Sequence, residues 1–137
     1  MTAEAFLDTN VLLYACSSAP ADAGKRTIAE GLILETDFAL SGQVLQEFIS
    51  NALCKKELGI SENGIEATME LSGHVPVQPI TRELILSAII LRRRFRLSHW
   101  DSTIVAAARE LGCHTLYSED LNPGQDYDGV RVVNPFQ

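Results

Sequence analysis

Short apolar runs alternate along the chain with longer segments in which apolar residues recur every three or four positions. The short runs are typical of buried strands and lie at 5–8, 37–40, 75–80, 114–118 and 130–133. The longer segments predict helices at 22–35, 41–56, 61–72, 81–95 and 97–113, and another helix begins within 10–17. Because strands alternate with helices, we predict an α/β fold, a three-layer sandwich with a mostly parallel central sheet.

Two helix starts carry side chains suited to capping. Thr81 stands directly before the helix at 81–95, where its hydroxyl can accept a hydrogen bond from a free backbone N–H. Ser98 and Asp101 have the spacing of a capping box at the start of the helix at 97–113. Between the last two strands, residues 119–129 are rich in turn-forming residues, and we expect a loop there.

Composition places the chain among ordinary globular proteins. Its 137 residues, 46% hydrophobic and 21% charged, fit a single domain over 1–137, and no linker or repeat interrupts them. No apolar run is long enough to cross a membrane, and the N-terminus lacks the basic region of a signal peptide. The three cysteines form no CxxC pair, which favours reduced thiols. We therefore expect a cytoplasmic protein with no membrane contact.

Acidic residues occur at positions where a parallel sheet would collect ligands. Asp8 ends the first strand, and Asp120 follows the strand at 114–118 by two residues. Because ligands collect outside the carboxyl ends of parallel strands, both carboxylates should project from one edge. Glu47 and Asp101 lie on two of the predicted helices. Each acid also has a purely structural interpretation: Asp8 as a strand end, Glu47 as a solvated side chain off the apolar stripe, and Asp101 as a helix-capping charge.

Carboxylates gathered in one place imply a cation. They repel one another, so some must take up protons unless positive charge is present. Hard divalent cations such as Mg²⁺ or Mn²⁺ prefer oxygen ligands and can activate water for displacement at phosphorus.

The local sequences around these acids resemble a known family. "FLDTNVLLYA", "VLQEF", "SHWDSTIVAAA" and "LYSEDL" contain Asp8, Glu47, Asp101 and Asp120 in that order, and the chain ends in "YDGVRVVNPF". The set resembles PIN-domain ribonucleases, in particular the VapC-type toxins of toxin–antitoxin pairs. The resemblance implies a Mg²⁺-dependent endoribonuclease, with Mn²⁺ as a possible substitute, that leaves a 5′-phosphate and a 3′-hydroxyl. It also implies a cognate antitoxin that covers the cleft, and a homodimer.

The resemblance assigns roles to particular residues. Asp8, Asp101 and Asp120 would hold the metal, and Glu47 would hold it directly or through water. Asn10 and Ser118 would orient these ligands, although an asparagine after a strand is also an ordinary N-cap. The family pattern selects Asp120 over its neighbour Glu119, which is then expected to be solvated.

Basic and aromatic residues precede Asp101 along the chain. Although the net charge is −7, a value that disfavours broad attraction to nucleic acid, four arginines gather within five residues: Arg92, Arg93, Arg94 and Arg96. They suit the dipole at a helix end, and equally one or two of them could contact RNA phosphates. We expect Trp100, the only tryptophan, to belong to the core in preference to a base-stacking surface.

Two other functions fit parts of the pattern. Acids at strand ends also suit a phospho-acceptor signalling domain, but such a domain needs a lysine after a late strand, and the only lysines are Lys25, Lys55 and Lys56. The second is a catalytically silent PIN-like binding module, against which the complete set of acids argues.

Overall fold

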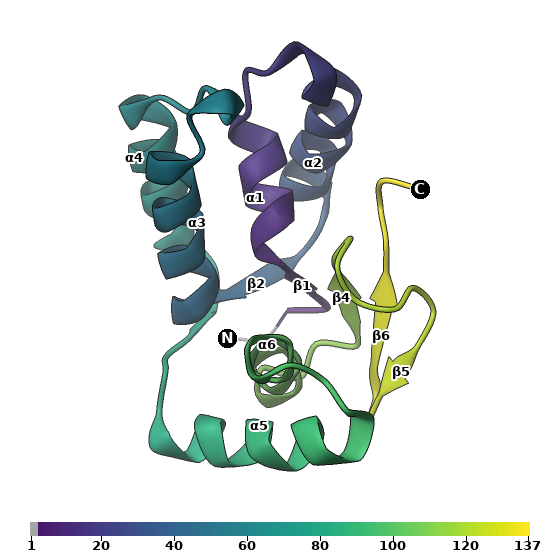
Figure 1. Cartoon of the computed structure of the whole chain (residues 1–137). Helices are drawn as coiled ribbons and strands as arrows, with labels where there is room; N and C mark the ends of the chain where they lie inside the picture. Colours follow the sequence, from purple (N-terminus) through teal and green to yellow (C-terminus); the bar gives the residue numbers. More distant parts are fainter. Residues whose placement is uncertain (1–2) are drawn as a thin grey trace.

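The computed structural model describes residues 3–137 and shows one sheet lying between two groups of helices (Figure 1). The predicted domain of residues 1–137 also includes residues 1 and 2, which lie outside the described part. The strands are β1 (Ala5–Leu7), β2 (Phe38–Ser41), β3 (Val77–Gln78), β4 (Thr115–Tyr117), β5 (Asp126–Tyr127) and β6 (Val130–Val133). They run in the order β3-β2-β1-β4-β6-β5, and every pair is parallel except β5 with β6. The predicted mostly parallel sheet is confirmed.

Helices cover both faces of this sheet. The α-helices are α1 (Thr9–Cys16), α2 (Ala23–Glu35), α3 (Gly42–Cys54), α4 (Glu62–Ser72), α5 (Arg82–Phe95) and α6 (His99–Glu110). Two short 3₁₀ helices, η1 (Pro20–Asp22) and η2 (Lys56–Leu58), connect them. In Figure 1, α1 to α4 lie above the sheet, whereas α5 and α6 lie below it. This arrangement confirms the predicted α/β class and its three layers.

Side chains at the helix starts explain where the helices begin. Before five of the six α-helices, a side-chain oxygen accepts a hydrogen bond from a backbone N–H of the first turn; the capping residues are Asp8, Ser41, Ser61, Thr81 and Ser98. The predicted cap at Thr81 is therefore confirmed. Ser41 belongs to β2 and caps α3, which is why this helix begins at Gly42 and not at residue 41.

The hydrophobic pattern predicts the structure least accurately at the loop of residues 119–129 and at the ends of α6. The predicted loop at 119–129 contains a strand, β5, which pairs with β6 through a tight turn at Asp128 and Gly129, both with positive φ. A two-residue strand is too short to show alternation, so turn residues dominate the local pattern. Helix α6 is shorter than predicted because Ser98 caps its start and Gly112, at φ +73°, lies just beyond its end.

The sheet centre is apolar and fully covered. Phe6, Leu7, Leu40, Leu116 and Val132 come from four neighbouring strands and are completely buried. Strand β1 lies between β2 and β4, and the chain leaves β1 toward β2 before it returns through α5 and α6 to β4. The carboxyl ends of β1 and β4 therefore mark a topological switch point, where open α/β sheets bind their ligands. Within residues 3–137, no helix combines the length and hydrophobicity needed to cross a bilayer.

Candidate active site

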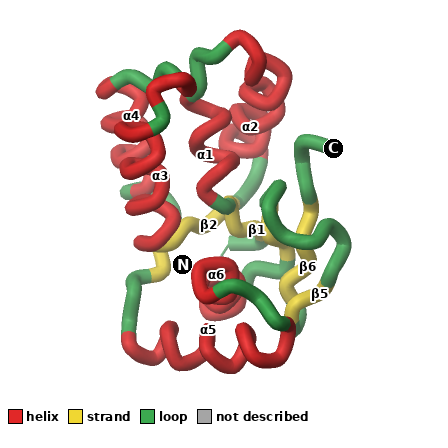
Figure 2. The backbone as a smooth tube through the Cα atoms, viewed as in Figure 1, coloured by secondary structure: helices red, strands yellow, loops and turns green. Residues whose placement is uncertain are grey.

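A cavity of about 340 Å³ lies where β1 and β4 end. The four predicted carboxylates all line it, and they reach it from four different segments: Asp8 after β1, Glu47 from α3, Asp101 from α6 and Asp120 from the loop after β4. That loop is drawn as a green tube beyond β4 in Figure 2. Asp8 and Asp120 are far apart in the sequence but line the same cavity, because β1 and β4 are paired neighbours in the sheet.

Asp8 is the buried member of the set. Its Oδ1 accepts a hydrogen bond from the backbone N–H of Thr9 at 2.7 Å, and its Oδ2 accepts one from the Ser118 hydroxyl at 2.7 Å. The pKa of Asp8 is raised from its ordinary 3.8 to about 6 because burial, with smaller contributions from the charges of Asp120 and Glu47, outweighs the lowering effect of these two hydrogen bonds. The protein therefore holds this carboxylate in place but leaves its charge only partly compensated.

Glu47 is held from two sides. Its Oε1 accepts a hydrogen bond from Nε2 of Gln43 at 2.9 Å, and its Oε2 accepts one from the Thr9 hydroxyl at 3.2 Å. The side chain thus bridges α3 to the first residue of α1, so the interpretation of Glu47 as a purely solvated residue is wrong.

Asp101 lies in the first turn of α6 but does not supply the N-cap. That group is Ser98, whose Oγ accepts a hydrogen bond from the Asp101 backbone N–H at 3.1 Å. The Asp101 side chain is half-buried, and partial burial raises its pKa; the Ser98 hydroxyl lowers it, and the Asp120 charge raises it again. Because Ser98 provides the cap, the Asp101 carboxylate can face the cavity.

Asp120 is fixed by the two residues predicted to orient the ligands. Nδ2 of Asn10 donates to Oδ2 of Asp120 at 3.1 Å, and the Asp120 backbone N–H donates to the Ser118 Oγ at 3.1 Å. Ser118 therefore joins Asp120 to Asp8, since its hydroxyl also donates a hydrogen bond to the Asp8 carboxylate. Oδ1 of Asn10 is buried and has no hydrogen-bond partner among the described residues.

Gln43 is a residue that sequence reasoning missed. It is buried on α3; its Nε2 donates to Glu47 and to the backbone carbonyl of Trp100, at 2.9 and 3.2 Å, and its Oε1 accepts from the Thr103 hydroxyl. This one amide connects the helix that carries Glu47 to the helix that carries Asp101. The available signal was its position four residues before Glu47, one helical turn along the same face.

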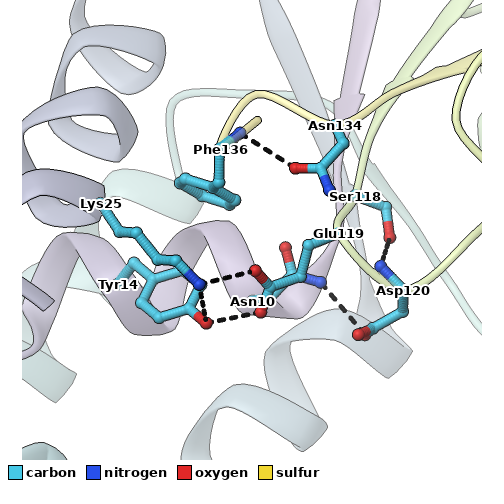
Figure 3. A network of polar contacts seen from close by, with 8 residues as sticks. All are labelled: Asn10, Tyr14, Lys25, Ser118, Glu119, Asp120, Asn134 and Phe136. Carbon is cyan, nitrogen blue, oxygen red and sulfur yellow. Dashed lines mark hydrogen bonds and ion pairs between the residues drawn. The ribbon is translucent and has the colours of Figure 1, made fainter.

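A polar network supports the loop that carries Asp120 (Figure 3). Glu119 accepts a hydrogen bond from the Tyr14 hydroxyl at 2.5 Å and forms an ion pair with Lys25 at 3.2 Å. The Phe136 ring packs edge-on against Tyr14, with the ring centroids 4.9 Å apart. The expectation that Glu119 is solvated is wrong, because Glu119 anchors the loop to α1 and α2. The C-terminal Phe136 closes the same cluster.

The donor atoms around the cavity suit a hard cation, although they do not enclose one. Within residues 3–137, no group of three or more Asp, Glu, His or Cys residues is close enough to hold a metal ion. Each of Asp8, Glu47 and Asp120 is instead hydrogen-bonded to a neighbouring donor. The atoms available as metal ligands are carboxylate oxygens and the unpartnered amide oxygen of Asn10. Mg²⁺ and Mn²⁺ prefer such oxygen ligands. Simultaneous coordination by three carboxylates requires some of these side chains to rotate.

The four clustered arginines lie outside the cavity. Arg92, Arg93 and Arg94 occupy the exposed last turn of α5, Arg96 follows at φ +55°, and none of the four lines the cavity. Arg94 forms an ion pair with Asp128 at 2.7 Å. The predicted contact with RNA phosphates stays a prediction.

Trp100 is not part of the core. Its side chain is 64% exposed, so the core assignment is wrong. It lies one residue before Asp101 and lines the cavity.

Comparison with known proteins identifies the family. The PIN domain family matches residues 5–124, a stretch that covers most of the chain and includes the four cavity carboxylates. The chain belongs to the PIN-domain family. A search of curated protein sequences found no match.

Solved structures with the same fold include toxins of toxin–antitoxin pairs. This PIN domain is similar to VapC20 of Mycobacterium tuberculosis, described as a sarcin–ricin-loop-cleaving toxin, with 22% identity, a TM-score of 0.64, and coverage of 85% of this chain and 89% of the other. A toxin–antitoxin complex from Klebsiella pneumoniae matches with 19% identity, a TM-score of 0.67, and coverage of 96% and 97%. VapBC2 from Rickettsia felis, bound to a DNA fragment from its promoter, matches with 17% identity, a TM-score of 0.63, and coverage of 93% and 96%. At these identities the likeness shows the fold.

Proposed function

We propose that this PIN domain is a divalent-cation-dependent endoribonuclease that acts as the toxin of a toxin–antitoxin pair. The observation that carries the proposal is the convergence of Asp8, Glu47, Asp101 and Asp120 on one cavity at the switch point of the sheet. The similar VapC20 cleaves the sarcin–ricin loop, as its description states, which supports RNA as the substrate class. Two similar structures are toxin–antitoxin assemblies, which supports an antitoxin partner.

The chain's own residues would provide ligands and their orientation. Asp8, Asp101 and Asp120 would hold Mg²⁺ or Mn²⁺, and Glu47 would hold it directly or through water. When bound, the cation would lower the pKa of a water molecule and neutralise charge on the phosphate. Asn10 and Ser118 would keep Asp120 and Asp8 aimed at the cavity, because each already donates a hydrogen bond to one of them.

RNA cleavage by purified protein tests this function. Wild type should cleave RNA in Mg²⁺, and cleavage should stop in EDTA. Asp8→Asn and Asp101→Asn should each lower the cleavage rate at least about 100-fold, because each removes a metal ligand while keeping the shape of the side chain. Glu66→Gln is the matched control, since it removes one negative charge from the exposed face of α4, away from the cavity. Wild-type cleavage that persists in chelator or in the aspartate variants would contradict the proposal.

Two alternatives have distinct outcomes. A catalytically silent PIN module would bind a partner but cleave nothing and take up no Mn²⁺. A phospho-acceptor domain would gain mass with acetyl phosphate and Mg²⁺. No lysine follows β4 in this chain, where Ser118, Glu119 and Asp120 stand instead, so the phospho-acceptor function has no support at that strand end. A homodimer and a cytoplasmic location stay predictions.

A further inference from the structure

A second groove adjoins the acidic cavity. It has a volume of about 470 Å³ and is lined by Gln43, Gln46, Glu47, Ser50, Ile80 and Trp100; we refer to it as the Trp100 groove. Glu47 and Trp100 also line the acidic cavity, so the two spaces lie side by side. A ligand long enough to pass these two side chains could occupy both.

The walls of the groove are aromatic and aliphatic, and both are held in place. Trp100 is 64% exposed, but its backbone carbonyl accepts hydrogen bonds from Gln43 at 3.2 Å and from Thr103 at 2.7 Å. The His99 ring packs edge-on against the indole, with the centroids 4.9 Å apart. Ile80 is 58% exposed and lies opposite the start of α3, where its Cγ1 is 3.6 Å from the position a Cβ on Gly42 would take. Two large exposed apolar side chains that line one groove form a contiguous apolar patch, a feature that marks binding surfaces.

The exposed surface of the groove is mostly apolar, and its polar residues share one face of α3. Gln43, Gln46, Glu47 and Ser50 are spaced at i, i+3, i+4 and i+7 on α3, so they share one helical face. Gln43 and Glu47 are already engaged by hydrogen bonds, whereas Gln46 and Ser50 are exposed. An amide and a hydroxyl beside an aromatic plane are the groups that hydrogen-bond the edge of a stacked base.

We propose that the Trp100 groove binds a nucleobase of the RNA, stacked on the indole next to the phosphodiester bond at the carboxylates. The proposal rests on the ribonuclease function and adds a substrate subsite to it. A nucleobase is favoured over a protein side chain because any occupant lies against Glu47. An apolar protein side chain would remove water from that carboxylate without compensating its charge. A nucleotide would instead bind together with its phosphate and the cation that the carboxylates attract, and that cation would compensate the charge of Glu47.

Trp100 itself provides the assay, because it is the only tryptophan in the chain. Its fluorescence is followed while single-stranded hexamers of A, C or U are added with Ca²⁺ in place of Mg²⁺ to slow hydrolysis. Stacking should give saturable quenching with at least one hexamer. Ribose 5-phosphate, which carries a phosphate but no base, should leave the emission unchanged.

Variants separate stacking from other roles. Trp100→Leu should weaken binding of a labelled hexamer about 5- to 150-fold, and Trp100→Phe should recover part of the loss because the ring is retained. Ile90→Ala is the matched control, because Ile90 is a 66% exposed apolar residue on α5 outside both cavities. Folding should be unaffected, because the hydrogen bonds at position 100 involve the backbone carbonyl and not the indole.

Each contrary result is distinguishable. If wild type cleaves RNA with Mg²⁺ but shows no quenching, and Trp100→Leu binds hexamers as wild type does, the base subsite is wrong and the ribonuclease stands. If Trp100→Leu keeps its RNA affinity but loses self-association in light scattering, the groove is a protein interface and the proposal is overturned. If wild type neither binds nor cleaves RNA, the subsite and the proposed function both fail.

Discussion

Asp8 shows how a single buried acid connects stability to the cation site. Its pKa is raised from 3.8 to about 6 by burial, so the folded protein binds a proton more tightly than the unfolded chain does. Well below pH 4 both states are protonated at this residue, so Asp8 does not lower the free energy of unfolding. Between about pH 4 and pH 6, Asp8 ionises in the unfolded chain while it stays protonated in the folded protein, so the free energy of unfolding falls. Above pH 6 the folded state carries an unfavourable buried charge, which lowers the free energy of unfolding by about 3 kcal/mol.

The resulting prediction concerns Asp8→Asn in metal-free buffer. The free energy of unfolding of wild type should fall between pH 4 and pH 6.5, whereas that of Asp8→Asn should vary less and exceed wild type at pH 7 by about 2–3 kcal/mol. Urea unfolding across this pH range measures the difference, and Glu66→Gln should follow the wild-type profile. An Asp8→Asn protein less stable than wild type at pH 7 would show that the hydrogen bonds to Ser118 and Thr9 outweigh the burial of charge.

The Gln43→Ala variant tests how much hydrogen bonding at the site contributes to stability. Gln43→Ala would leave one Glu47 oxygen without its partner, and the Trp100 carbonyl and the Thr103 hydroxyl would keep only their hydrogen bond to each other, so the free energy of unfolding should fall by about 1–3 kcal/mol. Gln46→Ala, an exposed glutamine on the same helix, should change stability by less than about 0.5 kcal/mol. Thermal unfolding of the two variants measures this contrast; equal stabilities would mean that the amide contributes no net hydrogen bonding.

At the scale of elements, helix starts aim the functional side chains. Asp8 caps α1 and faces the cavity, and Ser98 caps α6 and thereby places Asp101 in the first turn. Helices α1 and α6 thus begin at the site, and the capping hydrogen bonds that fix the helices also orient the carboxylates.

The cap of α6 can be compared with a cap remote from the site. Ser98→Ala and Ser61→Ala each remove a side-chain cap, from α6 and α4, and each should lower the free energy of unfolding by about 1 kcal/mol. Only Ser98→Ala should also slow RNA cleavage, because α6 carries the cavity carboxylate Asp101 and α4 carries none. Equal cleavage rates for the two variants, measured well below their unfolding temperatures, would show that the cap does not position Asp101.

The sequence predicted these elements to different degrees. The strand from Val130 to Val133 was located to the residue, since a short valine-rich run directly follows Gly129. The helix boundaries differ from the prediction by at most three residues, in part because a serine such as Ser41 can end a strand and also cap the next helix. Strand β5 was missed because its two residues lie within a segment of turn-forming residues, which dominate the local pattern.

At the scale of the whole molecule, the site depends on topology. Asp8 and Asp120 meet because β1 and β4 are neighbours, an arrangement that the α/β pattern and the strand ends anticipated. The partners of these acids were harder to foresee. Glu119 was expected in solvent, yet Tyr14 and Lys25 hold it, and Trp100 was expected in the core, yet it is exposed. Such contacts depend on side-chain packing between segments, which no single-sequence periodicity records.

Mn²⁺ titration by calorimetry tests the central claim most directly, namely that four separate segments form one cation site. Wild type should bind Mn²⁺ saturably, Asp8→Asn and Asp101→Asn should each weaken binding at least about 10-fold, and Glu66→Gln should bind as wild type does. Asp8 and Asp101 belong to different segments, so equal dependence on both is the signature of a shared site. Absence of Mn²⁺ binding by wild type, or unchanged Mn²⁺ affinity in both aspartate variants, would contradict a shared cation site.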